Sequence, residues 1–141
     1  MTRVDFYIVT DVEPGARDLF ACRLVEKAVG LGHKVYVHTD SAEQARQFDD
    51  LLWTFRPGSF VPHELSRQQS SSTAPVLIGH HEDPDHHADV MVNVASEIPL
   101  FFSQFERVAE LVEQDNPSRE KARERFRFYR ERGYPLQTHN V

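Results

Sequence analysis

Short apolar runs and longer amphipathic stretches alternate along the first half of the chain. Residues 4–10 form a run rich in β-branched and aromatic side chains, which is typical of a buried strand. In residues 17–29, by contrast, Phe20, Leu24 and Ala28 recur at helical spacing and predict an amphipathic helix. A second strand is expected at residues 34–39. A chain that alternates strand with helix in this way predicts an α/β domain.

Two further helices are predicted from the residues at their starts. Ser41 is a favourable N-cap, with Gln44 in the capping-box position, so a helix is expected over residues 42–51. Asn116 followed by Pro117 predicts another start with Asn116 as the N-cap, and this helix should end at Gly133. Short strands are expected at residues 59–61, 76–79 and 89–94.

Three segments of the second half have weaker patterns. Residues 98–105 are predicted to begin with a helical turn after Pro99. The apolar positions of residues 106–113 fit either a helix or the two-residue alternation of a strand, so both remain open. The tail, residues 134–141, is expected to be only partly ordered. Residues 1–141 are therefore expected to form a single domain, with a mainly parallel sheet flanked by helices.

The stretch of residues 51–65 joins a predicted helix to a predicted strand and is unusually aromatic. It turns at Pro57 and Gly58, because Pro57 lacks a backbone N–H and Gly58 directly follows it. The pattern favours a connection that lines the core, but a surface platform covered by another protein remains open. The large side chains near the turn are Trp53, Phe55, Phe60 and Pro62.

Composition narrows the class of protein. The chain has 141 residues, of which 40% are hydrophobic, and its formal net charge is −6. No apolar run approaches the roughly 18 residues of a membrane span, and the first residues lack the apolar stretch of a signal peptide, so a cytoplasmic protein is expected. The single cysteine, Cys22, lies in a helical apolar pattern, which favours a buried, inert thiol over a nucleophile.

The charge is distributed unevenly. Residues 117–134 contain seven Lys or Arg and three Glu, which gives +4 and leaves −10 on the rest of the chain. An acidic protein with one basic helix is not expected to coat nucleic acid, but the helix could hold an acidic partner. A solvated helix with Glu–Arg pairs is the alternative, and both remain open. The residues within an arc of about 100° on this helix are Arg119, Arg123, Phe126, Arg127 and Arg130.

No motif of the chain predicts catalysis or nucleotide binding. The loop of residues 11–17 follows the first strand, where dinucleotide-binding sheets carry their glycine-rich turn, yet it has one Gly, and Asp11 and Glu13 would repel a phosphate. Residues 80–87 hold four His and three carboxylates, which could bind a transition metal. A solvated loop is favoured, because the cluster is continuous in sequence and interrupted by Pro84. We expect no metal and no cofactor.

Two segments together resemble the chi subunit of bacterial DNA polymerase III holoenzyme. The likeness extends over essentially the whole chain. The first segment is Trp53-x-x-x-Pro57-x-Ser59-Phe60-Val61-Pro62-His63, and the second is Ala122-Arg123-Glu124-Arg125-Phe126-x-x-Tyr129-Arg130-x-x-Gly133-Tyr134. The resemblance implies a Rossmann-like α/β fold in a non-catalytic subunit of a DNA-directed DNA polymerase, part of the clamp-loader assembly for DNA replication.

The resemblance also implies two protein partners and few direct contacts with DNA. The psi subunit would form a heterodimer through Trp53, Phe60, Pro62 and His63, and would link the chain to the clamp loader. The acidic C-terminal tail of single-stranded DNA-binding protein would bind at Arg119, Arg123, Phe126, Arg127 and Thr138. Phe126 stands where the family often has Tyr, and Arg127 where Lys is also found. The rival interpretations are an enzyme or phosphate-ligand binder on the same fold, and direct binding of single strands by the basic helix.

Overall fold

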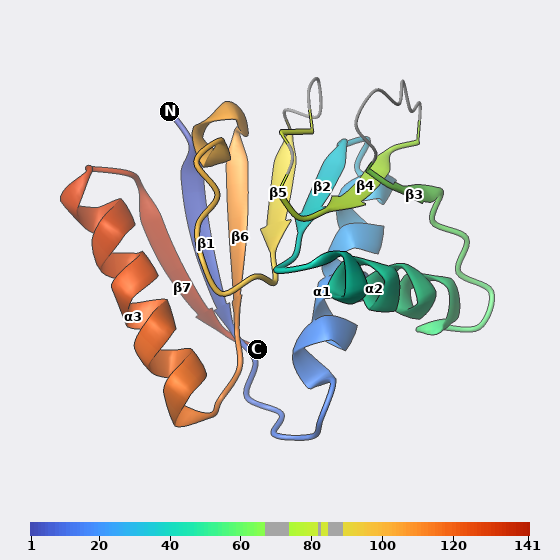
Figure 1. Ribbon diagram of the computed structural model, residues 1–141, viewed down its shortest axis with the longest axis horizontal. Coiled ribbons are helices and arrows are strands. Elements are labelled where there is room, and N and C mark those ends of the chain that lie inside the picture. Colours follow the sequence, from blue (N-terminus) through green and yellow to red (C-terminus); the bar gives the residue numbers. More distant parts are fainter. Residues whose placement is uncertain (67–73, 82, 85–88) are drawn as a thin grey trace.

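The computed structural model describes residues 1–66, 74–81, 83–84 and 89–141, and places seven strands of that part of the chain in one sheet (Figure 1). Every pair of neighbouring strands is parallel, in the order β3-β4-β2-β5-β6-β1-β7. The predicted α/β class and mainly parallel sheet are confirmed. The strands are β1 (Arg3–Ile8), β2 (Val35–His38), β3 (His63–Leu65), β4 (Val76–Gly79), β5 (Val90–Asn93), β6 (Arg107–Val112) and β7 (Leu136–Asn140); the helices are α1 (Ala16–Gly30), α2 (Ala42–Thr54), α3 (Asn116–Glu131) and the 3₁₀ turn η1 (Phe102–Gln104).

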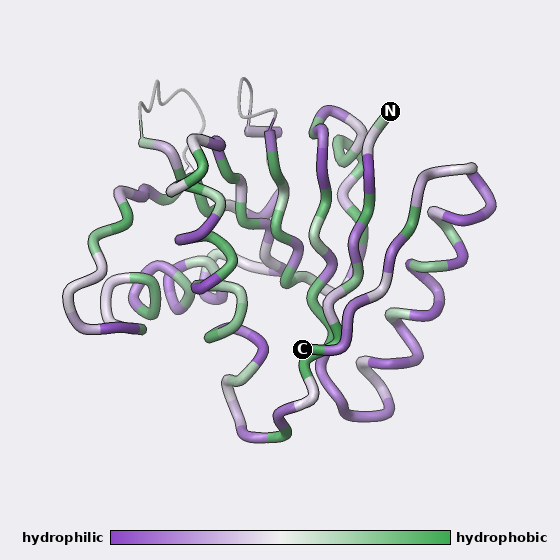
Figure 2. Tube along the Cα trace, turned by 180° about the vertical axis from the view of Figure 1, so that it is seen from behind, coloured by the Kyte–Doolittle hydropathy of each residue, from purple (hydrophilic) through white to green (hydrophobic). Residues whose placement is uncertain are grey.

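The two faces of the sheet carry separate apolar layers. On one face, Val25 of α1 and Phe48 of α2 pack with strand residues such as Val37. On the other face, Tyr129 of α3 and Phe102 of η1 pack with residues such as Phe6. Successive side chains of each strand alternate between these layers. Figure 2 shows hydrophobic and hydrophilic residues mixed along the strands and an α3 that is hydrophilic along most of its length.

The starts of the first two helices were predicted closely. Ser41 caps α2 by accepting a hydrogen bond from the Gln44 backbone N–H at 3.1 Å, and the Gln44 side chain accepts one from the Asp40 N–H at 2.6 Å. Cys22 of α1 is fully buried, and burial raises the pKa of its thiol to about 12, as expected for an inert thiol.

Two predictions for residues 51–65 were wrong. Helix α2 continues to Thr54, so Trp53 lies on the last turn of a helix. The strand expected at residues 59–61 is instead β3, at His63–Leu65, which pairs with β4 from His63 onward. Pro62 has no N–H to donate to a ladder, and ordered pairing begins directly after it.

In the second half, the choice between helix and strand for residues 106–113 is decided in favour of a strand. This strand, β6, is paired on both sides, with β1 and with β5. The expected turn after Pro99 is present as η1, where the Phe102 N–H donates to the Pro99 carbonyl at 3.1 Å. The N-cap of α3 is Asp115 and not Asn116, because the Asp115 carboxylate accepts the Ser118 N–H at 2.9 Å.

The chain end also differs from the prediction. Residues expected to be partly ordered form β7, which pairs with β1 along the edge of the sheet. The chain leaves α3 through a turn at Gly133, which takes a positive φ of +80°. The next residue, Tyr134, donates its N–H to the Tyr129 carbonyl at 3.1 Å. Strand β7 brings Thr138 alongside α3.

Parts of two predicted loops, residues 67–73 and residues 82 and 85–88, lie outside the described residues. In the ranges that are described, no helix is long and apolar enough to cross a membrane.

Candidate functional site

A small pocket lies between α3 and the edge of the sheet, and we call it the α3–β7 pocket. Its volume is about 140 Å³. Its floor is apolar, with Phe6 and Ile8 from β1 and Val112 from β6 beside Ala122 of α3. The Phe6 and Phe126 rings meet edge to face, with centroids 5.3 Å apart. A cavity of about 150 Å³ accommodates a benzene ring, so this pocket has room for one aromatic side chain.

The rim of the α3–β7 pocket is basic. Arg119 and Arg123 lie one turn apart on α3, both exposed, and Thr138 of β7 lines the other side. The structure thus brings together four of the five residues assigned to one site from the sequence. Arg127, the fifth, is exposed one turn beyond Arg123 but does not line the pocket. An apolar floor under two guanidinium groups suits a ligand that carries carboxylates next to an apolar group.

A buried polar cluster fixes the helix that carries these arginines. Glu110 of β6 is fully buried and accepts hydrogen bonds from Arg125 Nε at 2.9 Å, from the Tyr129 hydroxyl at 2.7 Å and from Asn93 at 3.0 Å. Arg125 also donates to the Ser96 carbonyl at 3.1 Å. Burial and the nearby Glu110 charge raise the pKa of Tyr129, so its hydroxyl stays protonated as a donor. Because Arg125 and Tyr129 point inward, Arg123 and Phe126 are held at the pocket.

A second group of assigned residues forms an exposed aromatic surface near β3, which we call the Trp53 surface. Trp53 is 58% exposed and Phe60 is 86% exposed, and Pro62 is also exposed. Phe60 lies between Ser59 and Val61, both of which are buried. The flanking residues therefore anchor the backbone inward and present the Phe60 ring to solvent. Exposed aromatic rings on an anchored backbone are typical of protein contacts.

The loop before Phe60 is tied to α1. Glu26 accepts hydrogen bonds from the Ser59 hydroxyl and from Arg56 Nη2, the latter at 2.7 Å. The Ser59 hydrogen bond contributes most to the lowered pKa of Glu26; desolvation opposes it, and the hydrogen bond and charge of Arg56 lower the pKa further. Gly58 takes the positive φ, +79°, that the turn requires.

His63, assigned to the same surface, is buried and lies behind Trp53. Their ring centroids are 4.5 Å apart, and His63 Nδ1 donates to the Val61 carbonyl at 2.6 Å. Its Nε2 lies 3.3 Å from Oδ1 of Asp49, although no residue of the described part of the chain forms a hydrogen bond with Nε2. His63 therefore packs against the buried side of Trp53 and is not itself part of the exposed surface.

The carboxyl edge of the sheet has a cavity of about 490 Å³, lined by the loop of residues 11–18 and by residues 113–115. Asp11, Glu13 and Glu113 contribute carboxylates to it, while Arg17 is paired with Glu113 at 3.1 Å. This lining opposes phosphate at the place where parallel sheets usually bind nucleotides. Among the described residues no group of three or more His, Cys, Asp or Glu is arranged to hold a metal ion, and half of the loop of residues 80–87 lies outside them.

Sequence reasoning missed two parts of the site. The pocket floor comes from β1 and β6, whose apolar residues look like ordinary core in the sequence. The buried cluster had one signal in the sequence, which is Glu110. It lies midway between Val108 and Val112 in the two-residue alternation, so its carboxylate faces the same apolar layer as they do.

The comparisons with known proteins agree with one another. The family described as "DNA polymerase III chi subunit, HolC" matches residues 1–137. The chain is 46% identical over 141 residues to the DNA polymerase III subunit chi of Pseudomonas aeruginosa, covering 100% of this chain and 98% of that one. It is 32% identical over 137 residues to DNA polymerase III subunit chi of Haemophilus influenzae, which covers 96% of this chain and 95% of that one. It is 27% identical over 143 residues to the subunit chi of Escherichia coli, which covers 98% of this chain and 97% of that one.

A solved structure shares the fold alone. The crystal structure of T4 UvsW superposes with a TM-score of 0.70 at 9% identity, over 99% of this chain and 42% of that chain.

Proposed function

The chain belongs to the DNA polymerase III chi subunit family, and on that premise we propose that it is a non-catalytic adaptor with two protein partners. At the α3–β7 pocket it would bind the acidic C-terminal tail of single-stranded DNA-binding protein. At the Trp53 surface it would bind the psi subunit and, through psi, the clamp loader. It would thereby connect coated single strands to the replicative polymerase, with little direct contact to DNA.

The observation that carries this proposal is the combination of pocket size and charge. In the family, the tail ends in acidic residues and a terminal Phe that bears the α-carboxylate. The α3–β7 pocket has about 140 Å³ for that ring, and Arg119 and Arg123 stand at its rim for the carboxylates. Thr138 offers a hydroxyl on the opposite side. Arg127, next to the rim, would contribute long-range attraction more than a direct contact.

Binding of such a tail should be of modest affinity and sensitive to salt. The exposed arginines are screened at physiological ionic strength over about 8 Å, and an extended peptide loses conformational entropy when it docks. Tethering of both partners in one assembly raises the effective concentration, which compensates for weak individual contacts.

Calorimetry with an acidic peptide that ends in Phe tests the tail site. Arg123→Ala should weaken binding at least about five-fold, because it removes a charge-assisted contact at the rim. Arg132→Ala is a matched control, since it removes the same charge from the end of α3 where Arg132 packs 3.6 Å over the Phe128 ring, away from the pocket. Trp53→Ala should also leave affinity nearly intact. Equal affinity of Arg123→Ala and the unmodified protein would refute the assignment.

The two rival functions make different predictions. A phosphate-ligand binder or enzyme should be stabilised by nucleotides in a thermal-shift assay. A direct single-strand binder should retain DNA at physiological salt with no partner present. Our proposal expects neither result.

A further inference from the structure

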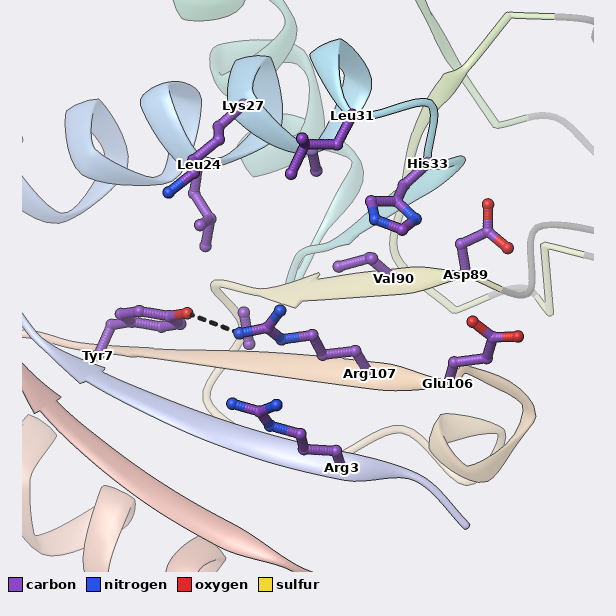
Figure 3. Close-up of a pocket in the computed structure, with 12 residues that line it drawn as sticks. Arg3, Tyr7, Leu24, Lys27, Leu31, His33, Asp89, Val90, Glu106 and Arg107 are labelled. Atoms are coloured by element: carbon purple, nitrogen blue, oxygen red, sulfur yellow. Dashed lines mark hydrogen bonds between the residues drawn. The ribbon is translucent and has the colours of Figure 1, made fainter.

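A second pocket lies on the opposite face of β1 from the α3–β7 pocket, and we call it the arginine pocket. It has a volume of about 310 Å³, between the C-terminal half of α1 and the first residues of β1, β5 and β6 (Figure 3). Arg3 and Arg107 begin β1 and β6 and are partners in the strand register. The volume falls at the lower end of the roughly 300–1,000 Å³ of small-molecule sites.

A single buried carboxylate holds both arginines. Arg107 Nε donates to Oδ2 of Asp5 at 2.8 Å, Arg3 Nε lies 3.5 Å from the same oxygen, and Asp5 is fully buried. Burial would raise the pKa of Asp5, but hydrogen bonds from His139 and Arg107 outweigh it and lower the pKa, so this carboxylate stays ionised. Arg3 also donates to Gln137 at 3.1 Å. The two guanidinium groups are thus held in place before any ligand arrives.

At the end of the pocket that holds Arg3 and Arg107, the positive charge exceeds the single negative charge of Asp5. Like charges directly opposite one another on neighbouring strands are destabilising, and here two guanidinium groups share one carboxylate. Lys27 of α1 lines the same end. The side chains of Arg3 and Arg107 remain 47% and 43% exposed, so N–H groups are available on the pocket side. Arg107 Nη2 also donates to the Tyr7 hydroxyl at 3.4 Å. An anion at this end would reduce the imbalance.

The wall opposite the arginines is apolar. Leu24, Ala28 and Leu31 of α1 line it, and Leu31 is 67% exposed. Figure 3 shows Leu24 and Leu31 on the helix across the pocket from the arginines. A ligand with an apolar body beside its charge would cover these leucines.

The other end of the pocket is acidic. Asp89 and Glu106 lie there with the His33 imidazole near Asp89, away from Tyr7 and Lys27 (Figure 3). Two carboxylates at this end repel a phosphate group that carries more than one negative charge. Inorganic phosphate also has no apolar body to cover Leu24 and Leu31, so the lining as a whole favours a carboxylate with an apolar body over phosphate.

We propose that the arginine pocket binds a small organic molecule with one carboxylate and an apolar body. The carboxylate lies between Arg3 and Arg107, and the body lies along Leu24 and Leu31. This site shares no residue with the α3–β7 pocket or the Trp53 surface, so it stands or falls independently of the proposed partners.

A nuclear magnetic resonance titration of the full chain with 4-phenylbutyrate tests the site. Saturable shifts are expected for the Arg3 and Arg107 side chains and for the Leu24 and Leu31 methyl groups. The uncharged amide of the same acid and inorganic phosphate should each bind at least about five-fold more weakly. Equal binding of the amide, or of phosphate, would overturn the proposal.

Two variants retain the buried Asp5 and its partner Arg107, so that a loss of binding in them does not reflect a loss of folding. Arg3→Gln and Leu31→Glu should each weaken binding at least about five-fold, while Arg23→Gln, an exposed arginine of α1 outside the pocket, should not. Unchanged binding in Arg3→Gln, or shifts confined to the α3–β7 pocket, would contradict the site. If the acidic peptide ending in Phe perturbs the arginine pocket and the small carboxylate does not, the occupant is a peptide and the small-molecule assignment is wrong.

Discussion

At the scale of single residues, His38 shows how burial of one imidazole makes stability depend on pH. It is 8% exposed, its ring meets Phe101 edge to face, and Nδ1 lies 3.0 Å from the Tyr36 hydroxyl. Burial lowers the pKa of His38 to about 4; Asp40 opposes this shift, while His81 and His80 add to it. The folded state therefore holds this imidazole neutral.

Stability should fall as the pH is lowered from about 6.5 to 4, because the unfolded chain takes up a proton on His38 before the folded chain does. Above about 6.5 the imidazole is neutral in both states and this loss is absent. Each pH unit in this window costs about 1.4 kcal/mol, so the total is up to about 3 kcal/mol. Urea unfolding of the protein and of His38→Gln at several pH values measures it. A slope with pH that is the same in both proteins would contradict the assignment.

At the scale of elements, α3 depends on tertiary contacts more than on its own sequence. Its exposed positions are mostly charged, and its buried residues are Ala122, Arg125 and Tyr129. Two of these three hydrogen-bond to Glu110 beneath the helix. The buried cluster therefore determines the rotation of the helix about its axis, and with it which arginines reach the α3–β7 pocket.

Glu110→Gln should destabilise the protein by about 3 kcal/mol, because it leaves the buried Arg125 guanidinium without its counter-charge. Tyr129→Phe should cost about 1 kcal/mol, the loss of one buried hydrogen bond. Chemical denaturation measures both. Glu106→Gln is the matched control, because Glu106 is exposed and should change stability by less than about 0.5 kcal/mol. Similar losses at Glu106 and Glu110 would show that the cluster does not fasten α3.

At the scale of the whole molecule, the two proposed partner surfaces lie at opposite ends of the sheet. The Trp53 surface adjoins β3, the first strand in spatial order, and the α3–β7 pocket adjoins β7, the last. Figure 1 shows α2 and α3 at opposite ends of the molecule. The two proposed partners would therefore bind at separate ends of one sheet.

Binding at the two surfaces should therefore be additive. Trp53→Ala should weaken psi binding by about 2 kcal/mol or more, as expected for an interface hot spot, and Arg123→Ala should leave it unchanged. The double variant is compared with the two single variants for binding of psi and for binding of the acidic peptide. In each comparison the coupling energy between Trp53 and Arg123 should stay within about 0.5 kcal/mol. Thr54→Ala, an exposed change beside Trp53, serves as the control. A coupling well above 1 kcal/mol would mean that the surfaces communicate or overlap.

The sequence by itself determined the alternation of strands and helices, the cap at Ser41 and the buried state of Cys22. Each of these follows from the periodicity or chemistry of residues close together along the chain. The resemblance of residues 53–63 and 122–134 also identified the family, which the comparisons confirmed.

Only the tertiary structure decided where these segments meet. Strand β7 exists because β1 offers it an edge, although the two are more than a hundred residues apart in the chain. The floor of the α3–β7 pocket, the inward turn of Arg125 beside the outward Arg123, and the pairing of Arg3 with Arg107 depend on the same long-range strand register. Local patterns report which side chains are apolar or charged, but register and packing decide which of them share a pocket.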